Sequence, residues 1–448
     1  MWASAWTTRT YQIRMVTPLF GGGPVAGQND SVTVVRGSTV RGHLRFWWRA
    51  TRGATCPSVL ELRKQEAKIW GNTEFPSPVQ VDVKVESCGR SEPWAEFKPR
   101  RDGTGLKAIP DPLDRRYPSY ALFPFQGKSR GNQVVERPAV VTKDLTFRLI
   151  LRWPADLHLD KDVEAAVWAW VNFGGLGART RRGCGTLFCD QLSPSAADLQ
   201  GNGSITQWYR TKCTDYGIEL PESPRPWPTL PRTILARYNG VQQLATPLDA
   251  WYQVIDLLRK FRQEINVGRN PGENGRPFGR SRWPEADSLR RVTRQALGRH
   301  RTAITTKENA FPRAEFGLPI IFHFKDGPRT PTSDADFDPV DCELKPAGGS
   351  GRMASPLILK ALAIKTHGGP KALPVIVRLQ TESLTGVVVE FEQGRGKQTH
   401  RFDETAIRRR ELASYRNSPL QGRSPEGSAL KGFLVYAHEN GFTGEGGN

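Results

Sequence analysis

The sequence of 448 residues predicts an α+β protein. Short apolar strands are mixed with amphipathic helices along the chain, without the regular strand–helix–strand period that a parallel α/β sheet requires. With 38% hydrophobic and 24% charged residues, the composition is typical of a soluble folded protein. At roughly 100 to 200 residues per domain, this length predicts two to four domains.

The N-terminal half begins with a strand over 10–18, in which Tyr11, Ile13 and Met15 occupy alternate positions. A helix follows over 38–52, with Ser38 or Thr39 placed to cap it. The same kinds of pattern predict helices at 61–70 and 162–173 and strands at 79–85, 120–125 and 145–151. Residues 89–116, rich in proline, glycine and charge, are predicted to form a long loop or insertion.

A change of composition to serine, glycine and proline over 193–231 predicts the main domain boundary. We therefore expect an N-terminal domain at 1–195, a linker at 196–231 and a C-terminal domain at 232–448. Beyond the linker, the sequence predicts an amphipathic helix at 247–263 and strands at 233–237, 318–324, 374–379, 386–391 and 433–437.

The chain carries 64 Lys and Arg against 45 Asp and Glu, a formal charge of +19, and 46 of the basic residues are Arg. Because Arg makes planar, bidentate contacts to phosphate and stacks on bases, the imbalance favours RNA or DNA as a partner. A GC-rich genome would also enrich Arg, Gly, Pro and Ala. Composition alone leaves both explanations open. The positions of the arginines along the chain are needed to distinguish a nucleic-acid partner from a GC-rich genome.

Several classes of protein are excluded at this stage. No run of about 18 apolar residues occurs, and residues 1–10 lack the pattern of a secretion signal, so a cytoplasmic protein without a membrane segment is expected. The six cysteines form no Cys-x-x-Cys pair, and no histidine clusters with them. We expect reduced, mostly buried thiols and no bound metal.

The predicted helix at 38–52 carries a row of arginines. At 100° per residue, its arginines fall within about 80° of one another; they are Arg41, Arg45, Arg49 and Arg52. An adjacent apolar stripe consists of Val40, Leu44, Trp47 and Trp48. Like charges spaced four residues apart destabilise an isolated helix, so the row indicates an RNA or phosphate partner unless acidic residues elsewhere pair with it.

A glycine-rich segment at 174–185 follows the helix predicted at 162–173. Five glycines allow close approach of the backbone to a ligand, and three arginines supply charge. The segment matches neither a Walker A loop nor the dinucleotide fingerprint, so no nucleotide cofactor is expected. A flexible surface loop is the alternative to a phosphate-backbone cradle. The candidate RNA-binding residues here are Gly174, Gly175, Gly177, Arg179, Arg181, Arg182 and Gly183.

A third basic region spans 259–301, where 11 Arg and one Lys face four acidic residues, giving a charge of +8. Aromatic residues and glycines are interleaved with the arginines, as in proteins that hold single-stranded nucleic acid. The candidates for RNA contact are Arg276, Arg280, Arg282 and Trp283. The alternatives are a solvated basic face and a docking surface for an acidic neighbouring subunit.

The segment 173–187, Phe-Gly-Gly-Leu-Gly-Ala-Arg-Thr-Arg-Arg-Gly-Cys-Gly-Thr-Leu, resembles the glycine-rich loop of the RAMP superfamily, RNA-binding proteins of CRISPR effector complexes. Further segments resemble the first Cmr subunit of type III-B complexes: 17–22, 35–49, 70–71, 279–287, 317–324 and 352–357. The resemblance implies two ferredoxin-like (RRM-like) RAMP domains. Relative to smaller members of the family, this chain has long insertions at 89–116, 193–231 and 390–448.

The resemblance also implies a function. Such a subunit binds RNA without cleaving it, near the 3′ portion of the guide RNA and the paired target RNA, beside other Cmr subunits. No cofactor is implied.

Two other functions stay open from the residues alone. His43, among the arginines of its helix, is a further candidate for RNA contact without chemistry. RAMP relatives that process guide precursors use a general base, and His43 is also the candidate for this role in a metal-independent endoribonuclease. His323 is expected to be structural, and Glu285 and Asp287 to cap or begin a helix. In the remaining alternative, a scaffold, the charge serves only subunit docking. No paired carboxylates stand out, so we expect no catalytic residues.

Overall fold

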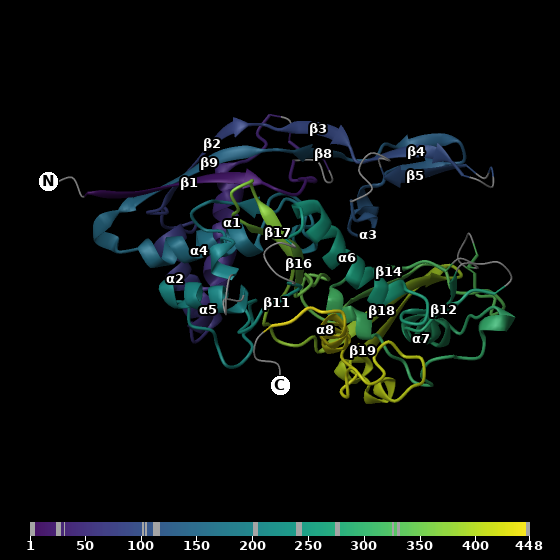
Figure 1. The fold of residues 1–448 in the computed structure, drawn as a ribbon. Coiled ribbons are helices and arrows are strands. Elements are labelled where there is room, and N and C mark those ends of the chain that lie inside the picture. Colours follow the sequence, from purple (N-terminus) through teal and green to yellow (C-terminus); the bar gives the residue numbers. More distant parts are fainter. Residues whose placement is uncertain are drawn as a thin grey trace. The chain divides into compact units, whose positions relative to one another are not determined.

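The computed structural model describes residues 5–23, 28–30, 32–100, 103, 105–110, 117–199, 205–238, 244–273, 278–324, 327–328 and 332–444. The chain divides into two compact units that are interleaved in sequence (Figure 1). Unit 1 comprises Met1–Asp256, Leu357–Glu382 and Phe442–Asn448, and unit 2 comprises Leu257–Pro356 and Ser383–Gly441.

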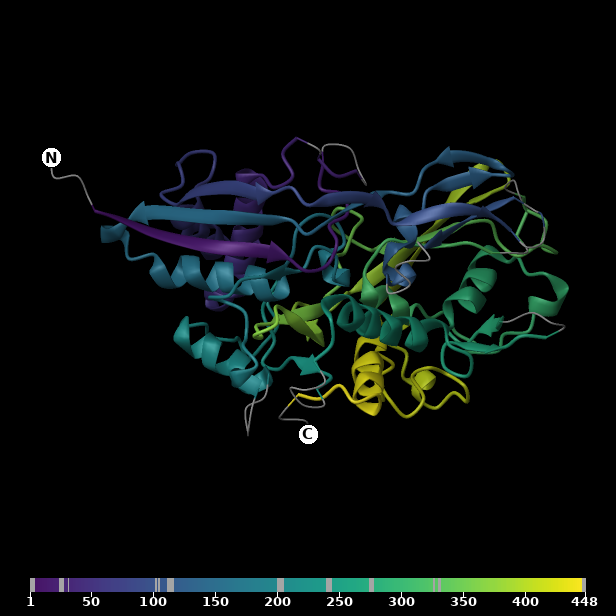
Figure 2. The ribbon, with the colours of Figure 1, turned by 45° about the horizontal axis from the view of Figure 1, so that its top comes forward.

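Unit 1 contains a four-stranded antiparallel sheet in the order β10-β1-β9-β2. Its strands are β1 (Trp6–Met15), β2 (Gln80–Ser87), β9 (Thr146–Pro154) and β10 (Leu187–Phe188). Helix α1 (Gly37–Ala50) connects β1 to β2, and α4 (Asp160–Phe173) connects β9 to β10. Figures 1 and 2 show both helices on the same face of the sheet. This is the βαββαβ arrangement of a ferredoxin-like domain, so the predicted α+β class is confirmed.

The alternation of apolar and polar residues along the strands explains which side chains of this sheet are buried. In β1, Tyr11, Ile13 and Met15 point into the core, and Gln12 and Arg14 are exposed. In α4, almost every residue from Val163 to Phe173 is buried, because β16 contacts the helix in addition to the sheet. A helix that is apolar all round is typical of such a central layer.

A second set of elements repeats this order along the chain. Strand β11 (Leu235–Ala236), helix α6 (Pro247–Gln263), strands β16 (Leu357–Ile364) and β17 (Lys371–Arg378), and helix α8 (Ala429–Glu439) follow one another, and Thr443 then bridges to Ala236. The lateral order is Thr443, β11, β17, β16, which matches β10-β1-β9-β2 position by position. The order of these elements along the chain is therefore that of a second ferredoxin-like domain, with long insertions between them.

Those insertions supply the sheet of unit 2, in the order β14-β15-β18-β19. The strands are β14 (Ile320–Phe322), β15 (Cys342–Pro346), β18 (Gly386–Gln393) and β19 (Gly396–Asp403). Leu344, Val387, Val389 and Phe311 belong to its core. The hairpin of β12 (Arg269–Pro271) and β13 (Phe278–Ser281) precedes α7 (Glu285–Thr293), which begins at the expected Glu285.

Several expectations about local structure are wrong. Residues 120–125 form α3 (Ser119–Leu122) and a 3₁₀ turn at Phe123–Phe125, because Pro118 and Pro124 favour turns over ladder hydrogen bonds. Residues 433–437 lie in α8, whose N-terminus is capped by the Ser428 side chain.

The predicted loop at 89–116 instead contributes three strands: β3 (Arg90–Pro93), β4 (Ala95–Pro99) and β5 (Leu106–Pro110). β3 pairs with β8 (Val140–Lys143), and β4 pairs with β5. The remaining short elements are α2 (Val59–Trp70), β6 (Lys128–Arg130) and β7 (Gln133–Glu136).

The boundary between the units also differs from the expected 1–195, 196–231 and 232–448. Residues 196–231 fall wholly within unit 1, and α5 (Ile205–Asp215) forms there, with Trp208 and Tyr209 packed against Trp168. The chain first passes from unit 1 to unit 2 after Asp256, within α6. In the described part of the chain, no helix is long and apolar enough to cross a membrane.

Candidate nucleic-acid interface

Helix α1 and the glycine-rich segment meet in unit 1. The His43 ring stacks on Trp170 of α4, with centroids 5.9 Å apart and an interplanar angle of 14°. The guanidinium of Arg181 lies 5.6 Å from the centroid of Phe46 on α1. Two sequence motifs about 130 residues apart are thus brought together, and the half-buried residues 177–182 form what we call the loop tip.

The glycine-rich segment is an ordered part of the core, so the alternative of a flexible surface loop is wrong. Its backbone is held to the segment after β1 by hydrogen bonds from Ala178 N to Phe20 O (2.6 Å) and from Gly185 N to Pro18 O (2.8 Å). Thr17 Oγ1 also donates to the carbonyl of Gly183 at 2.7 Å.

Most of the glycines make room for protein atoms. A Cβ added to Gly183 would lie 2.5 Å from the Trp251 ring, and one on Gly174 would lie 2.6 Å from Trp47 Nε1. Gly175 is likewise buried, against Gly185, and Gly177, with a φ of +78°, approaches the carbonyl of Phe20. The expectation that these glycines give a ligand access to the backbone is therefore corrected: the close approach is made by the protein itself.

The three arginines of the loop tip have different surroundings. Arg179 lies over the ring of Phe123, 5.8 Å from its centroid, and Arg182 donates from Nη1 to the carbonyl of Leu357 at 2.9 Å. Burial lowers the pKa of Arg179 and of Arg181, but a guanidinium keeps its charge in proteins. Among the described residues, no carboxylate pairs with Arg179. The Arg182 side chain thus binds a backbone carbonyl of β16, whereas those of Arg179 and Arg181 lie against aromatic rings.

His43 is half-buried. Burial lowers its pKa, so the imidazole is neutral at pH 7. Within the described ranges it has no hydrogen-bond partner, and its contact is the stacked Trp170 ring. No second acid or base of the described residues is placed beside it.

The arginine row of α1 is largely compensated. Glu66 of α2, whose side chain is 5% exposed, accepts hydrogen bonds from Arg45 Nε (2.6 Å) and Arg49 Nη1 (2.8 Å). Arg52 donates to the carbonyl of Gly217 and lies 3.6 Å from Asp162. Acidic partners thus account for three of the four arginines. For Arg41, the described residues provide none.

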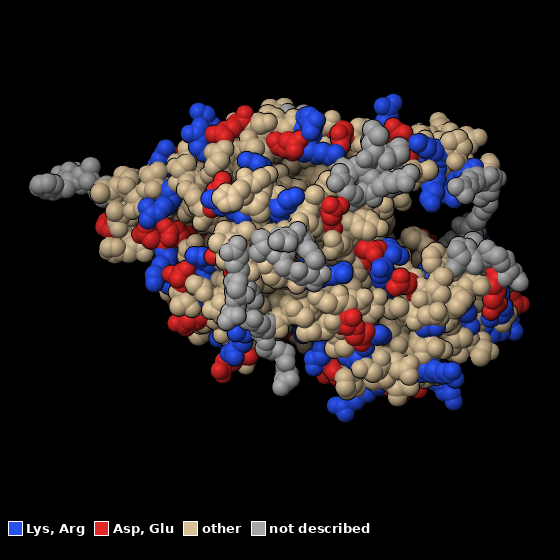
Figure 3. All heavy atoms as spheres, in the orientation of Figure 1, with Lys and Arg blue, Asp and Glu red and all other residues tan. Residues whose placement is uncertain are grey.

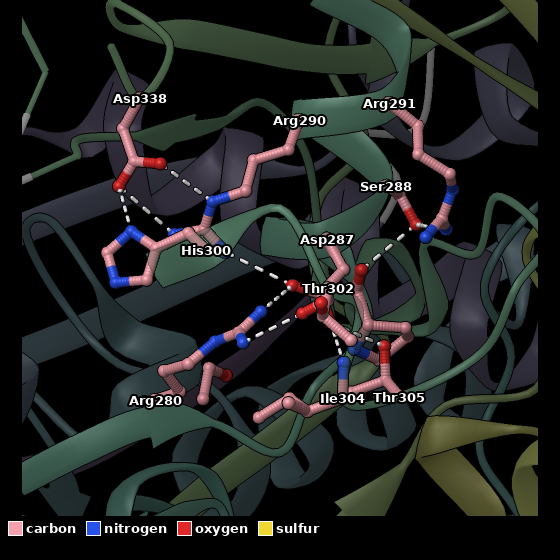
Figure 4. Close-up of polar contacts among 12 residues, drawn as sticks. Arg280, Asp287, Ser288, Arg290, Arg291, His300, Thr302, Ile304, Thr305 and Asp338 are labelled. Carbon is pink, nitrogen blue, oxygen red and sulfur yellow. Dashed lines mark hydrogen bonds and ion pairs between the residues drawn. The ribbon is translucent and has the colours of Figure 1, made fainter. Parts of the chain in front are cut away.

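Two arginines of the basic region at 259–301, Arg280 and Arg290, pair with two buried aspartates of unit 2, as Figure 4 shows. Asp287 accepts hydrogen bonds from Arg280 (2.7 Å), Arg290 (3.1 Å) and the backbone N–H of Ile304 (2.9 Å). Asp338 accepts from Arg290 Nε (2.9 Å) and contacts His300 Nδ1 (2.7 Å). The charge at Arg280 therefore stabilises the fold of this region.

Two further candidates of this region are also internal. Arg282 donates to Asn270 Oδ1 and to the carbonyl and side chain of Asn266. Trp283 is fully buried, packs edge-on against Phe261, and donates from Nε1 to the carbonyl of Arg262 at 3.2 Å. A ring without exposed surface cannot stack on a base, so that expectation for Trp283 is wrong. Arg276 lies outside the described residues.

The outward face of the first sheet carries paired charges. Arg148 pairs with Glu86 and Arg152 with Asp82, each at 2.8 Å. Figure 3 shows one face of the molecule, on which Lys and Arg side chains are interspersed with Asp and Glu. These arginines lie beside acids, so they contribute little net field for a phosphate backbone.

Sequence reasoning missed Phe46 and Phe123 as ring partners of arginines, and it missed Lys360. Lys360, fully buried in β16, donates from Nζ to the carbonyl of Gly174 at 2.8 Å. Burial lowers its pKa to about 7. A single lysine inside the apolar run Leu357–Ile364 was the available signal.

In the described part of the chain, no group of three or more metal-ligating side chains occurs.

The sequence of residues 12–187, which spans the first sheet, α1 and the loop tip, matches the family model of the RAMP superfamily. Over this region the chain is similar to proteins of the RAMP superfamily. Two similar proteins carry a more specific name than the superfamily, that of a Cmr subunit. The chain is 27% identical over 188 residues to CRISPR system Cmr subunit Cmr1-2 of Pyrococcus furiosus, covering 41% of this chain and 95% of the relative.

It is 25% identical over 154 residues to Cmr1-1 of the same organism, covering 34% of this chain and 40% of that protein. The resemblance to the first Cmr subunit is thereby confirmed.

Among solved structures, the chain is similar to the apo crystal structure of Cmr1 from Pyrococcus furiosus, with 14% identity and a TM-score of 0.42 over 90% of this chain and 96% of that one. It is also similar to a chain of the type III-B Cmr-beta complex bound to cognate target RNA and AMPPnP in the presence of ssDNA. That likeness has 11% identity and a TM-score of 0.38 over 84% of this chain and 95% of the other.

Proposed function

We propose that this chain is a non-catalytic RNA-binding subunit of a type III-B CRISPR effector complex, which contacts the guide RNA near its 3′ portion and the paired target RNA beside other Cmr subunits. The observation that carries the proposal is the loop tip, where Arg179 and Arg181 each lie against an aromatic ring. The names of the relatives support the assignment to a Cmr complex.

The loop tip has the chemistry of a single-strand contact. Guanidinium groups bind phosphate oxygens, and rings beside them offer surfaces to bases. Backbone hydrogen bonds such as Ala178 N to Phe20 O hold the loop in one conformation, so little ordering entropy is lost on binding. Half-burial of Arg179 and Arg181 also strengthens their attraction for an anion, because water screens them less.

The test measures binding of single-stranded RNA by the purified full-length chain over a series of salt concentrations. Arg179→Ala and Arg181→Ala should each weaken binding evenly across sequences and reduce the salt slope by about 0.7, the value for one phosphate contact on a single strand. Arg152→Ala, which removes an arginine paired with Asp82, is the matched control and should leave the slope unchanged. Equal slopes for all variants would contradict phosphate contact at the loop tip.

A second function, a metal-independent endoribonuclease, is favoured by one observation. The lowered pKa of His43 leaves its imidazole unprotonated and able to accept a proton at pH 7. Incubation of guide precursor RNA with the purified chain in the presence of EDTA tests it. Cleavage that is lost in His43→Ala would establish this activity and overturn the non-catalytic proposal, whereas intact RNA is the outcome we expect.

A further inference from the structure

The segment between β2 and β9 brings an exposed aromatic side chain to the loop tip. Phe123 begins the 3₁₀ turn Phe123–Phe125, and its side chain is 58% exposed. The turn is anchored by Phe125, which stacks on Phe20 with centroids 5.0 Å apart and an interplanar angle of 15°. Because the Phe20 carbonyl also accepts the hydrogen bond of Ala178, the turn and the loop tip share one anchor.

Arg179 completes this arrangement. Its backbone has a φ of +58°, and its guanidinium lies 5.8 Å from the centroid of the Phe123 ring. The Nε atom of Arg179 is buried and has no hydrogen-bond partner among the described residues. The cation is therefore held at the ring by the fold and by cation–π attraction, without an acidic partner.

An exposed Phe ring beside a guanidinium that has no acidic partner among the described residues has the makeup of a single-strand contact. Large exposed apolar side chains cost hydration free energy, and proteins that hold single strands use such rings to stack on bases next to arginines that contact phosphate. Phe75 provides a contrast within unit 1: it is 63% exposed, but no described cation lies over its ring. The pairing with Arg179 distinguishes Phe123 from a merely exposed side chain.

We propose that Phe123 and Arg179 form a stacking platform for one unpaired nucleobase of the bound RNA, next to the phosphates that Arg179 and Arg181 contact. The platform rests on the proposed function and deepens it, because it assigns base contact to a residue outside the glycine-rich segment. RNA is favoured over a protein partner because an apolar protein surface would bury the Arg179 charge without an acid. Stacking accepts every base, so the platform adds affinity without sequence preference.

The experiment uses the full-length chain and single-stranded RNAs in which one base, at successive positions, is 2-aminopurine. Stacking quenches the fluorescence of this base, so the wild-type chain should quench it strongly at one position. Phe123→Ala and Phe123→Leu should abolish that quenching and weaken binding about 5- to 100-fold with an unchanged salt slope. Phe123→Trp should retain both signals, and Phe75→Ala is the matched control.

The outcomes separate this proposal from the proposed function. If Phe123→Leu binds and quenches like the wild type while Arg181→Ala weakens binding, the platform is overturned and the RNA-binding function stands. If the wild-type chain binds no RNA, both fail. A loss of binding to a purified partner subunit in Phe123→Leu, with RNA affinity unchanged, would also overturn the platform and assign the ring to a protein contact.

Discussion

The ammonium group of Lys360 donates a 2.8 Å hydrogen bond to the carbonyl oxygen of Gly174, 186 residues earlier in the chain. It also lies 3.5 Å from the carbonyl of Val171, in the last turn of α4. The C-terminal end of a helix carries partial negative charge, which favours a cation there. The lysine thus joins β16 to the start of the glycine-rich segment, and no carboxylate of the described residues pairs with it.

Substitution of Lys360 by Met should change how stability depends on pH. The folded-state pKa of Lys360 is about 7, below the ordinary value of 10.5, so between these values the unfolded chain binds a proton that the folded chain does not. The free energy of unfolding of the wild type should therefore rise with pH in this window, by up to about 1.4 kcal/mol per pH unit from this residue. Lys360→Met should lack that contribution.

The measurement is urea unfolding of both proteins from pH 6 to pH 9.5. The stability of Lys360→Met relative to the wild type should be highest at pH 6 and fall as the pH rises. A difference that does not change with pH would contradict a lowered pKa at Lys360. The comparison of two proteins at each pH cancels the contribution of the other titrating groups.

The arginines of α1 that pair with acidic residues should contribute less to RNA binding than the arginine that does not. Arg45 is held by Glu66 at 2.6 Å, whereas Arg41 has no acidic partner in the described part of the chain. Arg41→Ala should reduce the salt slope of RNA binding by about 0.7, and Arg45→Ala should leave it nearly unchanged. Binding measured from 50 to 300 mM salt would show this, and equal reductions for both variants would contradict the role of Glu66.

Glu66→Gln should destabilise the protein more than Glu61→Gln. Glu66 is 4% exposed and accepts hydrogen bonds from two guanidiniums, so removal of its charge leaves two half-buried cations side by side. Because each arginine is about one-third exposed and partly solvated, we expect a loss of about 1–3 kcal/mol in the free energy of unfolding. Glu61 lies in the first turn of the same helix and serves as the control in urea denaturation.

The sequence predicted those features whose signal is local. The helix expected at 247–263 is α6 with the same bounds, because its amphipathic spacing is strong. The strand at 10–18 appears as β1, since Tyr11, Ile13 and Met15 alternate with polar residues. Strand β16 was missed because all eight of its residues are buried and it shows no alternation.

The candidate site was predicted in part. The convergence of α1 with the glycine-rich segment involves motifs that the sequence identified, but their partners depend on tertiary contacts. Glu66 lies on another helix from Arg45, and Phe123 was expected in a strand. Charge counting could not reveal that Asp338 and Asp287 neutralise Arg290 and Arg280, because Asp338 is 48 residues from Arg290 in sequence.

Asp338→Asn should destabilise the region around α7 without affecting RNA binding. The Asp338 side chain is 3% exposed and pairs with Arg290, which is 11% exposed, and with His300. Burial would raise the pKa of this carboxyl, but the hydrogen bond and charge of Arg290 outweigh burial and lower it. Loss of the charge leaves a buried guanidinium uncompensated, so we expect about 2–4 kcal/mol of destabilisation at pH 7.

The lowered pKa also fixes the pH dependence of this effect. The stabilisation by Asp338 is fully present above the ordinary carboxyl pKa of 3.8 and is lost as the pH falls through the lower folded-state value. Wild type and Asp338→Asn should therefore converge in stability as the pH falls through that lowered folded-state pKa. Asp336→Asn is the control, because Asp336 is 71% exposed and pairs with the exposed Arg301; it should change stability by less than about 0.5 kcal/mol. A reduced salt slope of RNA binding in Asp338→Asn would contradict an internal role for this network.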